Sequence, residues 1–240
     1  MIDEATARAF WLDRARVHDG PTAVHPDSRW LRYDAWTRGL LQTWTLARLR
    51  AIAPRFRRAV DLGCGHGDWT ARFARLVDEI HACDIAPELA AATQRRLAHH
   101  RAARVECADV RAFALPRELD LVYCGAVFMY LSDRAVGDVL RRVRAVLAPN
   151  AVVVVRDFCA FNGARRAERA HVVNRRPAEL RAIAEHAGLR CVELRSSPSI
   201  YGEVMGARLG GGLLGWPLRA LWRLATLHWR RASHTLVMRL

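Results

Sequence analysis

The glycine-rich stretch "AVDLGCGHGDWT", residues 59–70, constrains the fold of this chain more than any other segment. It places Gly63, Gly65 and Gly67 directly after a short apolar run. Glycine adopts positive φ without steric cost, and its missing side chain lets another group lie against the backbone. The stretch therefore predicts a buried strand that ends in a tight turn. That turn is either a plain turn, a dinucleotide site or the site of another nucleotide-like cofactor.

Strand and helix patterns alternate from residue 58 onward. We expect strands at residues 58–63, 79–84, 104–109, 119–125, 151–158, 190–195 and 233–240, and helices at 68–77, 87–99, 132–150 and 177–189. This alternation predicts an α/β fold, a doubly wound and mostly parallel sheet with helices on both faces. Ligands in such folds bind beyond the carboxyl ends of the strands. Besides the glycine turn, that edge receives Asp84, Asp109, Gly125 and Asp157.

Local signals predict where several of these elements begin and end. Ser132 is a good cap for the helix that follows it, and Gly188 suits the end of the 177–189 helix. Asn150 precedes the 151–158 strand, and asparagine tolerates the left-handed backbone conformation that such a turn needs.

The spacing of the glycines separates two kinds of cofactor. A nicotinamide site needs G-x-G-x-x-G after a strand, and an acidic residue about 20 residues later that binds the ribose. Asp84 lies 21 residues after Gly63 and fits, but the spacing here is G-x-G-x-G. An NAD-binding oxidoreductase therefore stays open as an alternative function, although the spacing of the glycines matches a nicotinamide site poorly.

A series of spaced motifs fits another cofactor better. "D-L-G-C-G-H-G" resembles motif I of the class I S-adenosylmethionine-dependent methyltransferases, in which the acid before the glycines, here Asp61, is part of the motif. "HACDIAPELA", "VECADVRAF", "DLVYCGAVFMYLSD" and "VLAPNAVVVVRDF" resemble the later motifs in the same order, over roughly residues 57 to 195. The resemblance implies a Rossmann-like sheet of seven strands and an enzyme that transfers a methyl group. S-adenosylmethionine is its implied cofactor and S-adenosylhomocysteine the product.

The chemistry of this cofactor matches the residue types at the sheet edge. Backbone N–H groups at the start of the 68–77 helix suit its carboxylate. Asp61 suits its ammonium, and Asp84 can accept both ribose hydroxyls. The resemblance further implies that Asp109 takes the adenine amino group, with Val110 and Ile85 against the ring. The expected cofactor-binding residues are Asp61, Gly63, Cys64, Gly65, Gly67, Asp84, Ile85, Asp109, Val110, Cys124 and Gly125.

The methyl acceptor is less constrained by the sequence, and nitrogen and oxygen acceptors both stay open. "VFMYLSD…VVVVRDFCAF" is locally similar to phosphoethanolamine-type and related small-amine N-methyltransferases. This similarity implies that Tyr130 and Asp157 face the acceptor. Tyr130 would orient it, and Asp157 would pair with a cationic amine or act as a base. The alternative is that Tyr130 only packs and Asp157 caps a turn.

The ends of the chain supply further acceptor residues in this interpretation. Residues 1–56 are expected to form a helical lid, with Tyr33, Trp36 and His171 as candidate acceptor-binding residues, although helical spacing equally predicts a core face. Residues 57–240 would form the cofactor-binding domain. A basic amphipathic insertion at about 208–232 would pack as an apolar lid, which suits a bulky acceptor, or rest on a membrane surface.

Composition adds limits on partners. The net charge is +14 and all 38 basic residues are arginine, scattered along the chain rather than gathered in a tail. Charge alone would admit an RNA or peptide methyltransferase, but no N/D-P-P-Y/F-like tetrapeptide follows the 119–125 strand, so nucleic acid is disfavoured. The six cysteines lack zinc spacing, and no secretory signal or membrane span is found. We therefore expect a cytoplasmic, metal-free enzyme that methylates small molecules in natural-product biosynthesis, with a non-catalytic cofactor-binding protein as a further alternative.

Overall fold

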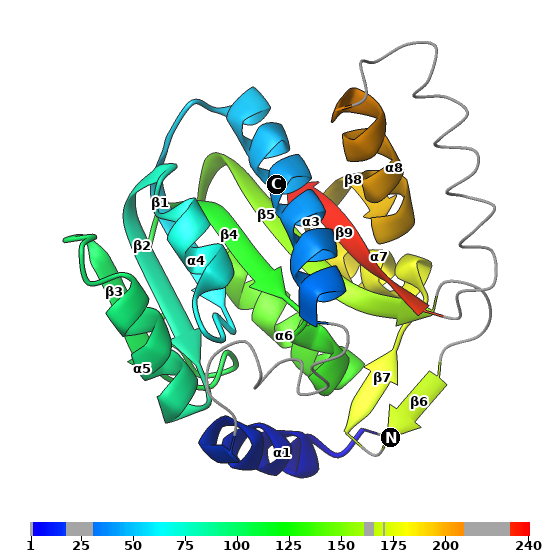
Figure 1. The fold of residues 1–240 in the computed structure, drawn as a ribbon. Coiled ribbons are helices and arrows are strands. Elements are labelled where there is room, and N and C mark those ends of the chain that lie inside the picture. Colours follow the sequence, from blue (N-terminus) through cyan, green and yellow to red (C-terminus); the bar gives the residue numbers. More distant parts are fainter. Residues whose placement is uncertain (1, 18–30, 161–165, 170, 209–230) are drawn as a thin grey trace.

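The computed structural model describes residues 2–17, 31–160, 166–169, 171–208 and 231–240. Its centre is a seven-stranded sheet in the order β3-β2-β1-β4-β5-β9-β8 (Figure 1). The strands are β1 (Phe56–Leu62), β2 (Val77–Asp84), β3 (Ala103–Cys107), β4 (Leu119–Gly125), β5 (Leu147–Ala160), β8 (Arg190–Ser196) and β9 (Arg231–Arg239). In this sheet, β9 runs antiparallel to β5 and β8, and the other pairs of neighbouring strands are parallel. The expected α/β fold with a mostly parallel, seven-stranded sheet is confirmed.

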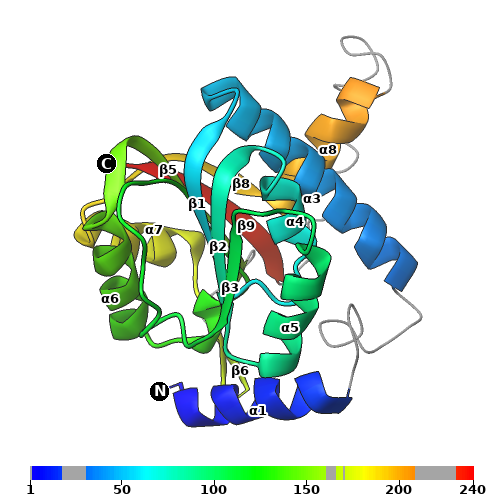
Figure 2. The ribbon, with the colours of Figure 1, turned by 90° about the vertical axis from the view of Figure 1, so that its left-hand side faces the viewer.

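Helices cover both faces of the sheet, as Figures 1 and 2 show. One face is covered by α3 (Leu31–Ile52), α4 (Asp68–Phe73), α5 (Pro87–Arg96) and α8 (Ser197–Arg208), and the other by α6 (Asp133–Arg144) and α7 (Pro177–His186). Each face has its own apolar cluster. The central strands are apolar on both sides because both sides are buried, which explains their continuous hydrophobic runs.

The carboxyl ends of the parallel strands lie near the bottom of Figure 1, next to α1 (Glu4–Val17). A 3₁₀ turn, η2 (Phe128–Tyr130), and a small hairpin of β6 (Arg166–Arg169) and β7 (Val172–Asn174) lie at the same end. The chain thus gathers its N-terminal helix and two short elements around the edge where a ligand is expected.

Several local predictions are confirmed. The Oγ of Ser132 accepts a hydrogen bond from the backbone N–H of Ala135 at 3.2 Å, so Ser132 caps α6. Asn150 and Gly188 both have positive φ, of 65° and 82°. Helix α4 is shorter than expected and ends at Phe73, because Val77 already pairs with Phe56 at the start of β2.

The region before β1 belongs to the fold. Leu40, Trp44 and Leu49 of α3 are buried in the same cluster as Val77 and Ile80 of β2. Helix α8 and the β6–β7 hairpin were not expected from the sequence. The amphipathic helix expected after Pro217 lies outside the described residues. No helix within the described ranges is long and apolar enough to cross a membrane.

A buried arginine holds the turn after β4. Arg175 is 1% exposed. Its Nε donates to Asp133 at 2.7 Å, and its terminal nitrogens donate to the backbone carbonyls of Phe128 and Leu131. A buried guanidinium is tolerated only with such partners. Arg175 therefore fixes η2 against the start of α6.

Replacing this arginine should destabilise the fold. Arg175→Met leaves two carbonyls and one carboxylate without their donor, and we expect the free energy of unfolding to fall by about 3–5 kcal/mol. Urea denaturation followed by circular dichroism measures it. Arg181→Met, which removes an exposed pair with Glu185, should cost less than about 0.5 kcal/mol. Equal effects of the two changes would contradict this role for Arg175.

Candidate functional site

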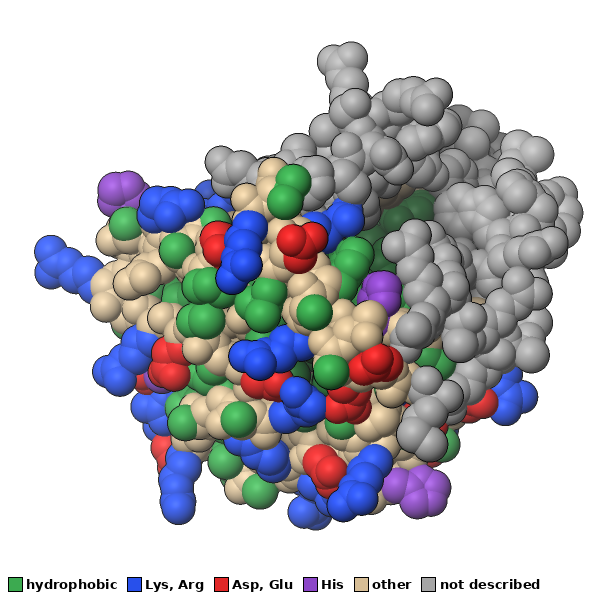
Figure 3. Space-filling model, turned by 90° about the horizontal axis from the view of Figure 1, so that it is seen from below, with side chains coloured by type: hydrophobic (Ala, Val, Ile, Leu, Met, Phe, Trp, Pro, Cys, Tyr) green, Lys and Arg blue, Asp and Glu red, His purple; other side chains and the backbone are tan. Residues whose placement is uncertain are grey.

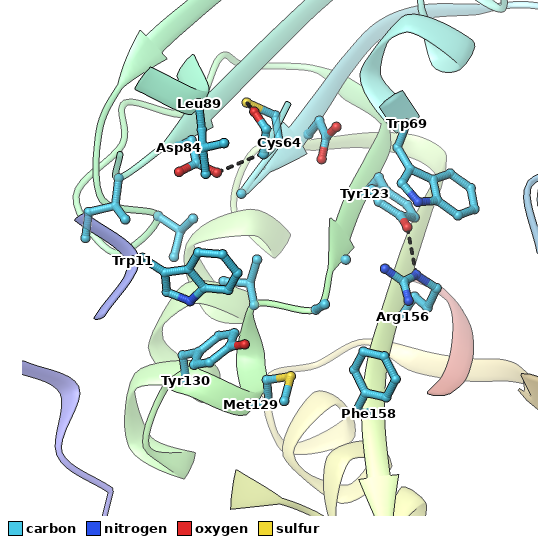
Figure 4. Close-up of a pocket in the computed structure, with 18 of the residues that line it drawn as sticks. Trp11, Cys64, Trp69, Asp84, Leu89, Tyr123, Met129, Tyr130, Arg156 and Phe158 are labelled. Carbon is cyan, nitrogen blue, oxygen red and sulfur yellow. Dashed lines mark hydrogen bonds between the residues drawn. The ribbon is translucent and has the colours of Figure 1, made fainter. Parts of the chain in front are cut away.

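A cavity of about 550 Å³ lies at the carboxyl ends of the strands (Figure 4), a volume typical of small-molecule sites. Its wall combines the glycine turn, the ends of β2, β4 and β5, the turn η2, and side chains from α1, α3 and α8. The expected cofactor-binding residues Asp61, Gly63, Cys64, Gly65, Asp84, Ile85, Asp109, Val110 and Gly125 all line it. Gly67 and Cys124 lie behind this wall.

Asp84 lies at the last position of β2, where its carboxylate is held by two backbone donors. One oxygen accepts from the N–H of Gly65 at 2.8 Å, and the other from the N–H of Ala86 at 3.0 Å. Burial raises the pKa of Asp84, although these hydrogen bonds oppose the shift. Each carboxylate oxygen has a further lone pair, so the group is oriented and still able to accept hydrogen bonds from a ligand.

Asp61 lies inside β1 and is almost fully buried. Its carboxylate accepts a 2.6 Å hydrogen bond from the hydroxyl of Thr70. Burial raises the pKa of Asp61 to about 7, the Thr70 hydrogen bond opposes the rise, and the charge of Asp84 adds to it. Asp61 is therefore poised to lose its proton when a cation arrives in the cavity.

Asp109 has an internal partner that sequence analysis did not anticipate. The Arg111 guanidinium donates hydrogen bonds to both carboxylate oxygens of Asp109, and it also forms an ion pair with Glu4 of α1 at 2.6 Å. Burial acts to raise the pKa of Asp109, but the hydrogen bonds from Arg111 outweigh it and the pKa is lowered. Glu4 also accepts from the backbone N–H of Ser132. These contacts fasten α1 across this side of the cavity. We call the part of the wall that contains Asp61, Asp84 and Asp109 the acidic end.

The glycines of the turn have different structural roles. A Cβ at Gly63 would lie 2.3 Å from Val127, and a Cβ at Gly67 would lie 2.8 Å from the hydroxyl of Thr93. These two positions allow close packing. Gly65 has nothing within 4 Å of such a Cβ, and its φ is +57°. Its backbone therefore borders open space at the acidic end.

The opposite part of the wall, which we call the aromatic end, consists of Trp69, Tyr123, Arg156 and Phe158 (Figure 4). The indole of Trp69 stacks on the ring of Tyr123, with centroids 4.9 Å apart. The Nε of Arg156 donates to the Tyr123 hydroxyl at 3.1 Å, and its guanidinium lies 5.7 Å from the Trp69 ring. None of these four residues was singled out from the sequence.

Tyr130, on η2, lines the cavity. The ring of Trp11 from α1 meets it edge-on, with centroids 5.4 Å apart. His171 lies outside the lining residues, where its ring stacks on Phe10 at 4.7 Å. The structure therefore places Tyr130 at the site and His171 in the packing behind it.

Asp157 does not line the cavity, contrary to the expectation that it faces the acceptor. Side chains alternate along a strand, so Arg156 and Phe158 point to the cavity and Asp157 points to the other face of β5. There it is 2% exposed, and its carboxylate accepts from the backbone N–H of Phe158 at 3.0 Å. Burial raises its pKa to about 7, against the opposing charge of Arg175.

Two further expectations concern α3. Trp36 is 41% exposed and does not line the cavity, whereas its neighbours Thr37 and Arg38 do. Helical periodicity explains this, because adjacent residues point about 100° apart. The side chain of Tyr33 lies outside the described part of the structure. Across the residues that are described, no three His, Cys, Asp or Glu side chains are grouped as metal ligands.

Comparisons with known proteins find methyltransferases. A family model described as a methyltransferase domain matches residues 59–150. A trans-aconitate 2-methyltransferase from Methylobacterium radiotolerans is 38% identical over 112 residues, which are 46% of this chain and 40% of that protein. The chain thus matches about two fifths of the length of this relative.

Solved structures share the fold over more of the chain. A SAM-dependent methyltransferase from Leishmania major has a TM-score of 0.72 at 14% identity, covering 98% of this chain and 82% of that one. Phosphoethanolamine N-methyltransferase 2 from Haemonchus contortus, solved with phosphomonomethylethanolamine and S-adenosylhomocysteine, has a TM-score of 0.60 at 15% identity, covering 82% and 52%. Residues 59–150 therefore match a methyltransferase domain, and the chain shares its fold with a SAM-dependent methyltransferase.

Proposed function

We propose that this protein transfers the methyl group of S-adenosylmethionine to a nitrogen or oxygen atom of a small molecule. The observation that carries the proposal is the Asp84 carboxylate, fixed by the N–H of Gly65 and facing a cavity of about 550 Å³. A carboxylate at this position matches the ribose diol of an adenosine, because each oxygen can accept one hydroxyl. The methyltransferase domain match covers this segment.

The other polar groups of the cavity fit the rest of the cofactor. Asp61 would hold its ammonium, and Asp109 its adenine amino group. Ile85 and Val110 offer apolar surface for the ring. Arg38 lies 3.8 Å from Asp68, the first residue of α4, and so adds a cation beside the glycine turn for the cofactor's carboxylate.

The aromatic end and η2 would hold the acceptor. When bound, S-adenosylmethionine would supply a methyl group on a sulfonium: a lone pair of the acceptor atom would form the new bond to the methyl carbon, and the electron pair of the broken C–S bond would stay on sulfur. The protein contributes alignment and the exclusion of water. Trp69, Met129 and Phe158 offer the apolar surface for this, and the Tyr130 hydroxyl would orient the acceptor. Residues 1–56 would act as the lid through α1 and α3.

A role in natural-product biosynthesis remains part of the proposal. The trans-aconitate 2-methyltransferase relative supports a small acceptor with oxygen atoms. The phosphoethanolamine enzyme shares the fold alone and leaves the nitrogen alternative in place.

Cofactor choice tests the proposal first. Isothermal titration calorimetry should detect binding of S-adenosylhomocysteine and none of NADH. Asp84→Asn should weaken S-adenosylhomocysteine binding by about 2 kcal/mol, roughly 30-fold, because a charged acceptor for two hydroxyls is lost. Binding of NADH alone would refute the proposal.

Asp120→Asn is a matched control for this variant. Asp120 also accepts two backbone N–H groups, from Arg57 at 2.7 Å and Arg58 at 2.9 Å, but it does not line the cavity. Its replacement should leave the dissociation constant of S-adenosylhomocysteine unchanged. A loss of equal size in both variants would assign the effect to folding rather than to ribose binding.

The raised pKa of Asp61 makes cofactor binding depend on pH. Below a pH of about 7 the free protein holds a proton on Asp61, and an arriving ammonium must displace it. Affinity for S-adenosylhomocysteine should therefore fall as the pH drops from 8 to 5.5, by at most about tenfold per pH unit. Calorimetry in two buffers of different ionisation enthalpy measures the released proton.

Asp61→Asn should remove the part of this proton release that comes from Asp61, and should lower affinity at pH 8. Asp157→Asn is the control, because the pKa of Asp157 is also raised to about 7 by burial but its side chain lies outside the cavity. This second variant should keep the pH dependence of wild type. Proton release that is unchanged in Asp61→Asn would exclude Asp61 as the partner of the ammonium.

A further inference from the structure

The cavity wall contains one partly buried cation that the cofactor does not explain. The acidic end, Arg38 and the glycine turn already match the charged groups of S-adenosylmethionine. Arg156 lies apart from them at the aromatic end, on β5 (Figure 4). Its Nε is occupied by the Tyr123 hydroxyl, and the terminal nitrogens of its guanidinium are turned towards the open centre of the cavity.

Arg156 differs from Arg38 and Arg111 of the wall in its partners, and from the fourth arginine, Arg8, in being partly buried rather than exposed. Arg111 pairs with Glu4 and Asp109, and Arg38 lies 3.8 Å from Asp68. Among the described residues, no carboxylate oxygen is recorded within 4.0 Å of the Arg156 guanidinium. Asp157, the next residue, points to the other face of the strand. Within the described part of the chain, the charges of Asp61 and Asp157 act on Arg156 through space, but neither carboxylate forms a contact ion pair with it.

The surroundings of Arg156 fix its orientation without neutralising it. The Tyr123 hydroxyl holds one edge of the guanidinium, and the Trp69 ring lies beside it at 5.7 Å. A guanidinium keeps its charge at any physiological pH, and burying it is costly unless an anion pairs with it. Its remaining N–H groups form a planar fork, which matches the two oxygens of a carboxylate.

We propose that the Arg156 guanidinium binds a carboxylate of the methyl acceptor, so that the substrates of this enzyme are small carboxylic acids with an apolar body. This rests on the proposed methyl transfer. The apolar body would lie on Trp69 and Phe158, and the acid group would face Arg156. S-adenosylmethionine also has a carboxylate, which Arg156 could bind instead. The experiment distinguishes the carboxylate of the acceptor from that of the cofactor.

The test uses the full chain saturated with S-adenosylhomocysteine. Phenylacetate, hexanoate and glutarate are added one at a time, and phenylacetamide, hexanamide and glutaramide serve as neutral counterparts. At ten times its dissociation constant, a bound acid should raise Tm by roughly 3 °C in differential scanning fluorimetry, and its amide should not. Arg156→Met should abolish the shift and leave the dissociation constant of S-adenosylhomocysteine within about twofold of wild type.

Control variants distinguish the loss of the proposed carboxylate contact from a folding defect. Arg48→Met removes an exposed arginine of α3 that pairs with Glu193, and it should respond like wild type. Arg156→Lys keeps the charge without the planar fork and should give a smaller shift. Should Arg156→Met fail to fold, Tyr123→Phe replaces it, because this variant releases the guanidinium from its hydrogen bond and should also reduce the shift.

The outcomes separate the two proposals. If wild type does not bind S-adenosylhomocysteine, the proposed function fails, and this inference fails with it. If S-adenosylhomocysteine binds but no acid shifts Tm, or acids and amides act alike, the inference alone is overturned. If Arg156→Met weakens S-adenosylhomocysteine binding tenfold or more, Arg156 holds the carboxylate of the cofactor and the inference is wrong.

Discussion

The tie between the glycine turn and the end of β2 is the contact on which the site depends. The backbone N–H groups of Gly63 and Cys64 both donate to the carbonyl of Cys83 at 2.9 Å, and the N–H of Gly65 donates to Asp84. Positive φ at the glycines bends the chain back far enough for these bonds to form. One short segment therefore ends β1, starts α4 and fixes the orientation of the buried carboxylate. Displacing it would disturb both the sheet edge and the cavity.

Charge is divided along the cavity in a way that suits two different ligands. The acidic end gathers Asp61, Asp84 and Asp109, whereas the aromatic end has a guanidinium. On the face seen from below, arginines are interspersed with acidic side chains (Figure 3). Surface pairs of this kind contribute little to stability and are screened by salt. The net charge of +14 is therefore a weaker indication of binding partners than the few buried or partly buried charges of the cavity wall.

Sequence patterns predicted most of the fold and the acidic end, but little of the aromatic end. Glycines, strand-end acids and helix caps act locally, so their positions can be read from neighbouring residues. The strand "AVVVVRDF" is apolar on both faces, and its alternation gives no sign of which face Arg156 and Asp157 occupy. That choice is set by the pairing of β5 with β4 and β9. Similarly, Glu4 meets Arg111 across 107 residues of sequence, a contact that only the folded chain creates.

The position of Asp157 also limits the protonation state in which the acceptor of the proposed reaction can react. With this carboxyl on the far face of β5, Trp69, Tyr123, Arg156 and Phe158 include no group that readily takes a proton near neutral pH. A neutral hydroxyl would have to lose its proton by another route, whereas an oxyanion or an uncharged amine needs no base. Transfer from a sulfonium to an oxyanion also removes one charge of each sign, and a cavity with little water favours that change. A guanidinium that attracts anions and an aromatic end without a base thus favour the same class of acceptor, an anionic one.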